Sequence, residues 1–165
     1  MQRLAAYWIE RLDLIRHPEG GYYREIYRSG LELHNLPAPF NGTRQASTSI
    51  YFLLEAGQFS AFHRIASDEI WHFYAGEELQ VFEILSDGNM ETHSLGTDPE
   101  KGESFQALIP AGHWFGARLS GEYGFALVGC TVAPGFDFKD FEMAERASLI
   151  KLYPDQEQII RELTR

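Results

Sequence analysis

Apolar residues near the start of the chain recur every three or four positions, which is the spacing of one face of an amphipathic helix. We therefore predict a helix over residues 2–15 that ends before Pro18, since proline cannot continue a helix without kinking it. The apolar side chains that carry this pattern are Leu4, Trp8, Leu12 and Ile15.

Further along, the pattern changes to short apolar runs that are separated by turn residues. A first run follows the Gly20-Gly21 pair, and residues 31–45, with two prolines and an Asn-Gly step, are expected to form a loop. Many short strands at regular spacing indicate an antiparallel sandwich or barrel. The remaining runs of strand length cover residues 46–57, 58–65, 68–76, 79–85, 90–96, 104–110, 113–119 and 123–133.

Helical periodicity returns near the end of the chain, in two amphipathic segments that are separated by Pro154. We therefore expect one all-β domain over residues 1–165, with its core barrel at about 20–135. An N-terminal helix and a C-terminal helical segment at about 138–165 complete it. The positions that carry the pattern in the two last segments are Phe141, Ala144, Ala147 or Ser148, and Leu152, then Ile159, Ile160 and Leu163.

Composition narrows the class of partner. The chain carries 14 Lys and Arg against 24 Asp and Glu, a net charge of −10, which argues against nucleic acid or an anionic membrane as the main partner. An aromatic content of 14% favours an interior lined by rings. Cys130, the single cysteine, stands in an apolar run and is expected to be a buried, inert thiol. We predict a cytoplasmic protein without a signal peptide or membrane span.

The candidate chemistry is concentrated in residues 57–76, "GQFSAFHRIASDEIWHFYAG". Alternate side chains of a strand share a face, so His63 and Ile65 point one way, and Glu69 shares a face with Trp71 and Phe73. If the two strands form a hairpin, His63 and Glu69 lie side by side on the inner face. His72 would then face outward unless a bulge intervenes.

This stretch resembles the first motif of the cupin superfamily, which consists of small jelly-roll barrels. Gly57, His63, Glu69 and Gly76 stand in register with it, and the Pro110–Gly112 turn resembles the second motif. Two positions depart from the motifs of the metal-binding cupins, since Ile65 and Phe115 stand where those proteins carry histidines.

Five blocks in the same order are similar to one cupin branch, whose members have been described as predicted sugar epimerases. The resemblance implies a cupin-type double-stranded β-helix, a homodimer, and a small-molecule ligand such as a sugar or nucleotide sugar. The blocks are "GGYYREIYRS", "STSIYFLL", "FHRIASDEIWHFYAG", "IPAGHWFGARL" and "GCTVAPGFDFKDFE".

The first functional hypothesis is an epimerase-like isomerase that uses acid–base chemistry without a cofactor. In the related epimerases the position of His63 holds the catalytic base, and Glu69 would orient it and raise its basicity. A tyrosine, Tyr51 or Tyr23, would act as the acid. An anionic group of the substrate would be bound by Arg24, Arg44 or Arg118.

Two alternatives stay open. A metal enzyme, an oxygenase or isomerase, would hold Fe, Mn, Ni or Zn with His63 and Glu69 and a third ligand from His72 or His113, although Ile65 and Phe115 disfavour it. A binding protein without catalysis would use aromatic rings as stacking surfaces. The rings considered are Trp71, Phe73, Trp114 and Phe115.

Other polar residues are interpreted as structural. We assign His17, His34 and His93 to surface or core packing, since an isolated histidine on a strand is more often a satisfied structural residue than a ligand. Asp137 or Asp140 is expected to cap the turn that follows the last strand.

Overall fold

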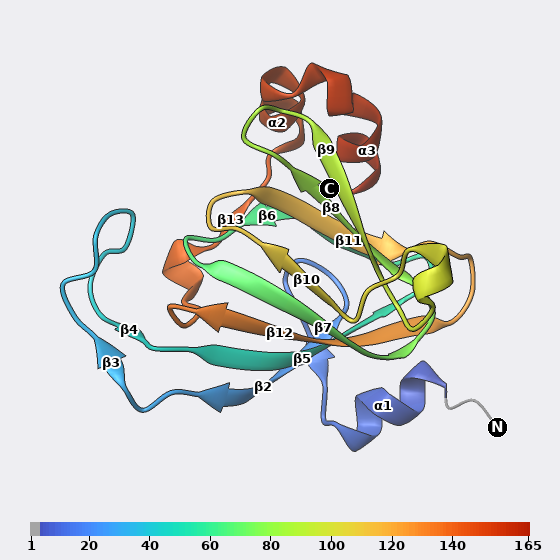
Figure 1. Ribbon diagram of the computed structural model, residues 1–165, viewed down its shortest axis with the longest axis horizontal. Coiled ribbons are helices and arrows are strands. Elements are labelled where there is room, and N and C mark those ends of the chain that lie inside the picture. The colour runs from blue at the N-terminus through green and yellow to red at the C-terminus, as the bar shows by residue number, and fades with distance from the viewer. Residues whose placement is uncertain (1–3) are drawn as a thin grey trace.

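The computed structural model of the protein describes residues 4–165 and consists mainly of two antiparallel sheets packed face to face (Figure 1). This arrangement confirms the predicted jelly-roll architecture. The six-stranded sheet runs β1 (Ile15–Arg16), β2 (Tyr22–Arg28), β5 (Thr48–Glu55), β12 (Phe125–Ala133), β7 (Asp68–Gly76) and β10 (Gln106–Ile109). The five-stranded sheet runs β13 (Glu142–Met143), β6 (Phe59–Arg64), β11 (Trp114–Leu119), β8 (Leu79–Ile84) and β9 (Met90–Leu95).

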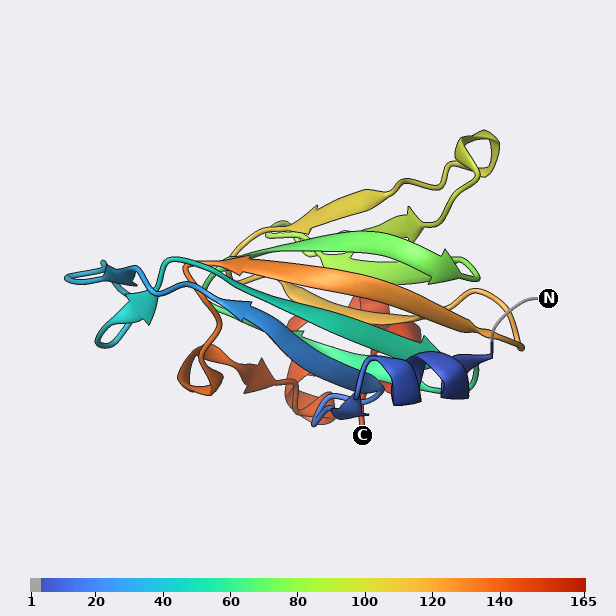
Figure 2. The same cartoon turned by 90° about the horizontal axis from the view of Figure 1, so that it is seen from below.

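The predicted strands from residue 46 to residue 133 are all present, each within three residues of its expected ends. The expected loop at 31–45 contains two paired strands of two residues each, β3 (Glu32–Leu33) and β4 (Arg44–Gln45). This hairpin projects from one end of the sandwich (Figure 2). Turn residues therefore set the strand boundaries here, as the sequence pattern suggested.

The N-terminal helix is shorter than predicted. Helix α1 covers Ala5–Arg11, because the chain turns at Asp13, which has a φ of +49°, and then enters β1. Residues 2 and 3 of the expected helix lie outside the described residues. Trp8 and Leu12 pack against the outer face of the six-stranded sheet, where Leu53 and Leu127 are buried.

The interior between the sheets holds the main core, with fully buried side chains such as Phe52, Trp71 and Phe115. A second core lies between the outer face of the five-stranded sheet and the C-terminal helices α2 (Arg146–Leu152) and α3 (Glu157–Glu162) (Figure 1). Short 3-10 turns lie at Pro99–Lys101, Phe138–Asp140 and Pro154–Gln156. Within residues 4–165, no helix has the length and apolar character needed to cross a membrane.

The strands β6 and β7 do not form the expected hairpin. They belong to different sheets, so the turn between them carries the chain from one layer of the sandwich to the other. β6 pairs with β11 and β13, whereas β7 pairs with β12 and β10. As a consequence, His63 and Glu69 approach the interior from opposite sheets rather than side by side.

Candidate functional site

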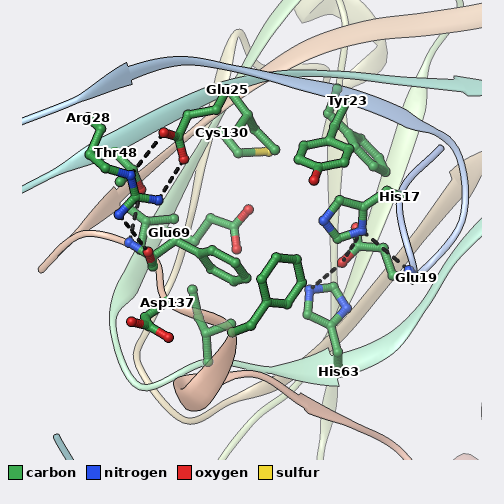
Figure 3. A pocket seen from close by; sticks show the side chains of 16 residues that line it. His17, Glu19, Tyr23, Glu25, Arg28, Thr48, His63, Glu69, Cys130 and Asp137 are labelled. Carbon is green, nitrogen blue, oxygen red and sulfur yellow. Dashed lines mark hydrogen bonds and ion pairs between the residues drawn. The ribbon is translucent and has the colours of Figure 1, made fainter. Parts of the chain in front are cut away.

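A cavity of about 390 Å³ lies between the sheets and is lined by both charged and apolar side chains (Figure 3). Its walls come from the loop before β2, from the inner faces of β2, β5, β6, β7 and β12, and from the segment that follows β12. The lining residues are His17, Glu19, Tyr23, Glu25, Arg28, Thr48, Ile50, Phe52, His63, Ile65, Glu69, Cys130, Val132, Phe136, Asp137 and Phe138.

His63 lies on the inner face of β6 and is almost fully buried. Its Nδ1 atom is 2.7 Å from the carbonyl oxygen of Ala61, and this contact requires a proton on Nδ1. Its Nε2 atom lies 3.2 Å from Oε2 of Glu19 (Figure 3). Desolvation lowers the pKa of His63 from 6.5 to about 4, although the Ala61 carbonyl opposes the change. The imidazole is therefore neutral at neutral pH.

Glu19 reaches His63 because of the turn that follows it. Gly20 has a φ of +123°, and a side chain there would clash with the carbonyl of Phe59, so glycine lets the loop lie against β6. The Ser60 hydroxyl donates to Oε1 of Glu19 at 2.7 Å. Desolvation raises the pKa of Glu19, while His17, Ser60 and Arg165 oppose the change. Glu19 and His63 thus form a buried pair that can hold one proton between them.

Glu69 lies on the opposite wall, on β7, and is also buried. Burial, with a smaller contribution from the Glu19 charge, raises the pKa of Glu69 from 4.5 to about 8. Its carboxyl group is hydrogen-bonded to the Cys130 thiol, whose own pKa is raised well above 9.0 by burial. The prediction that Cys130 is buried is confirmed. At neutral pH the cavity thus presents a neutral imidazole and a protonated carboxyl group from two different sheets.

Arg28 and Glu25 form a polar rim of the cavity. The Arg28 guanidinium donates to Glu25 at 2.9 and 2.6 Å and to the carbonyl of Phe136 at 3.2 Å (Figure 3). A β-bulge between Glu25 and Tyr27 shifts the register with β5, so Arg28 pairs with Thr48. Thr48 is an inward position, and the bulge thereby places Arg28 on the inner face of the sheet, at the exposed rim of the cavity.

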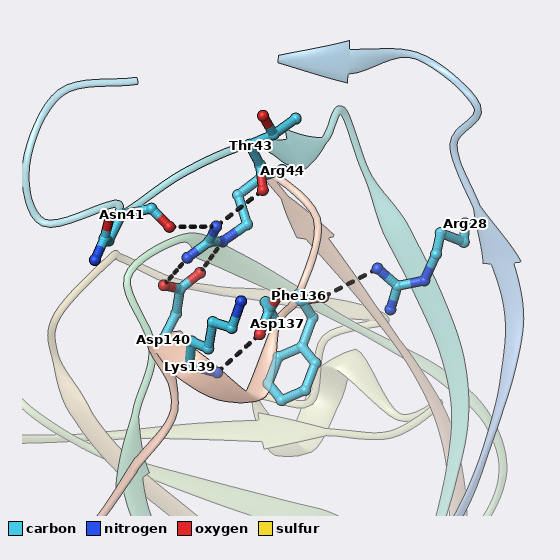
Figure 4. A network of polar contacts seen from close by, with 8 residues as sticks. All are labelled: Arg28, Asn41, Thr43, Arg44, Phe136, Asp137, Lys139 and Asp140. Carbon is cyan, nitrogen blue, oxygen red and sulfur yellow. Dashed lines mark hydrogen bonds and ion pairs between the residues drawn. The ribbon is translucent and has the colours of Figure 1, made fainter. Parts of the chain in front are cut away.

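The segment of residues 136–141 after β12, called the aromatic segment here, closes one side of the cavity. Phe141 stacks on His63 with ring centroids 5.1 Å apart, and Phe138 and Phe136 contact Phe141 edge-on. The segment is anchored by Asp140, which accepts two hydrogen bonds of 2.6 Å from the buried Arg44 (Figure 4). The predicted cap is confirmed for Asp137, which accepts from the Lys139 amide.

Three of the residues expected at the site line the cavity: His63, Glu69 and Tyr23. Tyr51 does not, because it points to the outer face of the six-stranded sheet, where its ring meets Tyr74 edge-on. The carboxylate beside His63 is Glu19, not Glu69 as expected, since the two strands of the motif lie in different sheets.

The expected arginines and rings lie elsewhere. Arg24 is exposed and forms an ion pair with Asp13. Arg118 is half-buried and forms an ion pair with Glu162, and Arg44 is buried in its ion pair with Asp140. Trp71, Phe73 and Phe115 are parts of the main core, whereas Trp114 belongs to the core beneath the C-terminal helices. None of these side chains lines the cavity.

The two histidines proposed as additional metal ligands are also outside it. His72 faces outward as parity predicts, and its ring nitrogens contact Thr131 and Gln106. His113 lies on the inner side of the five-stranded sheet but contacts Glu83 rather than His63 or Glu69. Neither completes a ligand set with the cavity residues.

The family of the chain follows from a model that matches most of its length. The model is described as Cupin superfamily (DUF985) and matches residues 6–144. The chain belongs to the cupin superfamily. An uncharacterised protein of Saccharomyces cerevisiae is 32% identical to this cupin over 153 residues, which cover 85% of this chain and 73% of the yeast protein.

Solved structures agree with this family. A hypothetical protein from Leishmania major has a TM-score of 0.92 and 38% identity, covering 98% of this cupin and 99% of that chain. A protein from Shewanella oneidensis has a TM-score of 0.89 and 41% identity, covering 99% of both chains. Oxalate decarboxylase from Bacillus subtilis, which contains Mn(II) centres, is similar in fold alone, with a TM-score of 0.54, 16% identity, and 90% of this cupin matching 36% of that chain.

The cavity of this cupin does not fit the metal centre that metal-binding cupins carry. Ile65 shares the cavity with His63, and Phe115 is buried in the core, so hydrocarbon stands at two ligand positions. Both ring nitrogens of His63 are engaged by protein oxygens, from Ala61 and Glu19. Among residues 4–165, the group of side chains close enough to hold a metal lies instead at Glu83, Glu91 and His93.

Sequence reasoning missed several residues of the cavity. His17 was assigned to packing, yet its ring lines the cavity and its Nδ1 accepts from the Glu19 amide at 3.3 Å. The signal was present in "HPEGGYYRE", where two glycines follow a His and a Glu at the start of a strand. Arg28 carried no such signal, because its inward position depends on a bulge.

Proposed function

We propose that this protein is a small-molecule isomerase that exchanges a proton at a carbon beside a carbonyl group, as sugar epimerases do. One observation carries the proposal: His63, in contact with Glu19, and Glu69 face one cavity from opposite sheets, and the pKa of His63 is lowered whereas that of Glu69 is raised. Separated pKa values of this kind mark a base and an acid that act at the same pH.

The chemistry follows from the two walls. The unprotonated Glu19–His63 pair takes the proton from carbon, and the electron pair of the broken C–H bond moves into an enolate. The protonated Glu69 carboxyl group stabilises the enolate by donating a hydrogen bond and then returns a proton to the opposite face of the carbon. Proton removal on one face and return on the other inverts the carbon without any redox change, and the pair then releases its proton to water while Glu69 takes one up, which restores the starting state.

The surroundings suit this reaction. The acid and base are almost fully buried, and in a low-dielectric site their hydrogen bonds to a charged intermediate are stronger than in water. A volume of about 390 Å³ is at the lower end of ordinary ligand sites and suits a single sugar ring. Arg28 at the rim suits an anionic group attached to that ring, such as a phosphate.

The test is deuterium incorporation from D₂O, followed by NMR, with chelator-treated protein. The panel contains ketose and aldose phosphates, nucleotide sugars, and nucleotide sugars that carry a ketone. We expect exchange of the carbon-bound hydrogen beside the carbonyl group of at least one class, and its loss in His63→Gln and Glu69→Gln. His34→Gln, on the exposed hairpin, serves as the matched control.

A non-catalytic binding protein is the other outcome that the experiment distinguishes. In that case a sugar or sugar phosphate raises the melting temperature of the wild type, and no deuterium is incorporated at any pH. Such a result would overturn the isomerase proposal while retaining the cavity as a ligand site.

A further inference from the structure

A second cluster of ionisable side chains lies away from the cavity, where β8, β9 and the start of β11 meet. It consists of Glu83 on β8, Glu91 and His93 on β9, and His113 just before β11. None of the four lines the cavity. Their strands lie side by side in the five-stranded sheet (Figure 1).

The strand register explains why these side chains meet. Glu83 is paired with Glu91 across the β8–β9 ladder, and His93 is paired with Val81. Leu79 and Val81 belong to the core between the sheets, so Glu83 faces the same interior. Along β11 the same parity places His113 on the side of Phe115.

Glu83 is the centre of the cluster. Its side chain is 3% exposed, and each of its carboxylate oxygens contacts an imidazole: Oε2 lies 2.7 Å from Nε2 of His93, and Oε1 contacts Nδ1 of His113. A buried carboxylate requires such partners, because desolvation without them is costly. Each imidazole is part-exposed, so the cluster is accessible from solvent.

Glu91 gives the cluster its second carboxylate. One ligand atom from each of Glu83, Glu91 and His93 lies within 4.8 Å of the others. Like charges directly opposite each other on neighbouring strands destabilise a sheet, and the β8–β9 register places two carboxylates in that relation. A divalent cation between them would offset both charges.

We propose that Glu83, Glu91 and His93 bind a divalent transition metal, with His113 orienting the Glu83 carboxylate. One imidazole and two carboxylates are donors that Zn²⁺, Fe²⁺ and Mn²⁺ accept. The metal takes the place of the proton between Nε2 of His93 and Oε2 of Glu83. The contact from His113 is the type of outer hydrogen bond that commonly fixes a ligating carboxylate.

This site is separate from the proposed acid–base site. Phe115 is paired with His63 on one side and with Glu83 on the other, and its buried ring therefore stands between the two clusters. The metal is accordingly not placed in the reaction. A measurement of metal binding alone tests this proposal independently of the isomerase activity.

The experiment uses the full chain without an affinity tag, treated with a chelator and then titrated with Zn²⁺ by calorimetry and by dialysis with elemental analysis. We expect one Zn²⁺ per chain. Glu91→Gln and His93→Gln should each weaken binding by at least about tenfold, and His113→Gln by roughly 10–100-fold. His63→Gln and His34→Gln should bind Zn²⁺ as the wild type does.

Glu91 is exposed, so Glu91→Gln is expected to fold even if a variant at a buried position does not. Circular dichroism of each variant checks this. The proposal is overturned if the wild type binds less than one equivalent, if Glu91→Gln and His93→Gln bind Zn²⁺ unchanged, or if binding is lost in His63→Gln or His34→Gln instead.

Discussion

Nε2 of His63 lies 3.2 Å from Oε2 of Glu19, and the contact joins the loop before β2 to the strand β6 of the other sheet. Ser60 donates to the second oxygen of Glu19, and the Ala61 carbonyl accepts from Nδ1 of His63. In each side chain, the polar atom that faces away from the other member of the pair is thus held by a hydrogen bond to the protein. The pair can take up one proton between Nε2 of His63 and Oε2 of Glu19, which is the property required of a catalytic base.

The first prediction concerns Glu19→Gln. The amide keeps the shape of the side chain and can still accept from Ser60, but it cannot share a proton with His63. Deuterium exchange should therefore fall by roughly a hundredfold or more, while the affinity for the ligand changes little. Ser60→Ala, which removes one partner of Glu19 but no proton carrier, should have a smaller effect. Wild-type exchange in Glu19→Gln would make Glu19 a packing residue.

The second prediction concerns pH and Glu69. Its pKa is about 8 in the folded protein and 4.5 ordinarily, so between these values the folded state binds more protons than the unfolded state. Stability therefore falls as the pH rises through this window. His63 has the opposite effect, because its pKa of about 4 lies below 6.5, and its contribution is lost as the pH falls from 6.5 towards 4.

Above about pH 7.5 an unfolded histidine is largely deprotonated, so the contributions of His63 and of His17 and His72, whose pKa values are also lowered, are nearly constant there, and the range from about pH 7.5 to 8.5 isolates the carboxyl groups. Urea denaturation of the wild type should show a free energy of unfolding that decreases across this range. Glu69→Gln should remove much of the decrease and leave a smaller slope from Glu19, whose pKa is also raised by burial. Parallel curves for wild type and Glu69→Gln would contradict a raised pKa for Glu69.

The third prediction assigns Arg28 to ligand binding rather than to chemistry. Arg28→Ala should raise KM for phosphorylated or nucleotide-linked ligands by about tenfold or more, and it should leave kcat nearly unchanged. Arg64→Ala is the matched control, since Arg64 forms a comparably exposed ion pair with Glu142 but does not line the cavity. An equal effect of both variants would remove Arg28 from the site.

The sequence was informative about the fold because turn residues and alternation are local signals. Gly57 and Gly76 bound the pair of strands that carries His63 and Glu69, and both side chains face inward as parity predicted. What parity cannot show is which sheet a strand joins. The turn after β6 carries the chain from one sheet to the other. The carboxylate in contact with His63 is therefore Glu19 and not Glu69.

The other differences between the sequence prediction and the structure arise from a β-bulge and from the register of strands that are far apart in the sequence. The bulge near Ile26 reverses the parity of the residues that follow it and turns Arg28 inward. The meeting of Glu83 with His93 and His113 depends on how β8 pairs with β9 and β11, which no short motif encodes. His93 was for this reason interpreted as a structural residue. The prediction of a homodimer stays a prediction.

The last prediction concerns the anchor of the aromatic segment. The side chains of Arg44 and Asp140 are 2% and 7% exposed, and Arg44 also donates to the carbonyls of Asn41 and Thr43 (Figure 4). Removing one member of a buried ion pair leaves the other without compensation, so Arg44→Ala should lower the free energy of unfolding by about 3–5 kcal/mol. Arg161→Ala, which breaks an exposed pair with Glu157, should lower the free energy of unfolding by only about 0–1 kcal/mol.

Because Asp140 holds the segment that contains Phe136 and Phe138 over the cavity, Arg44→Ala should also weaken ligand binding at temperatures where it remains folded, as measured by calorimetry. Equal stability of the two variants would show that the anchor contributes no more than a surface pair.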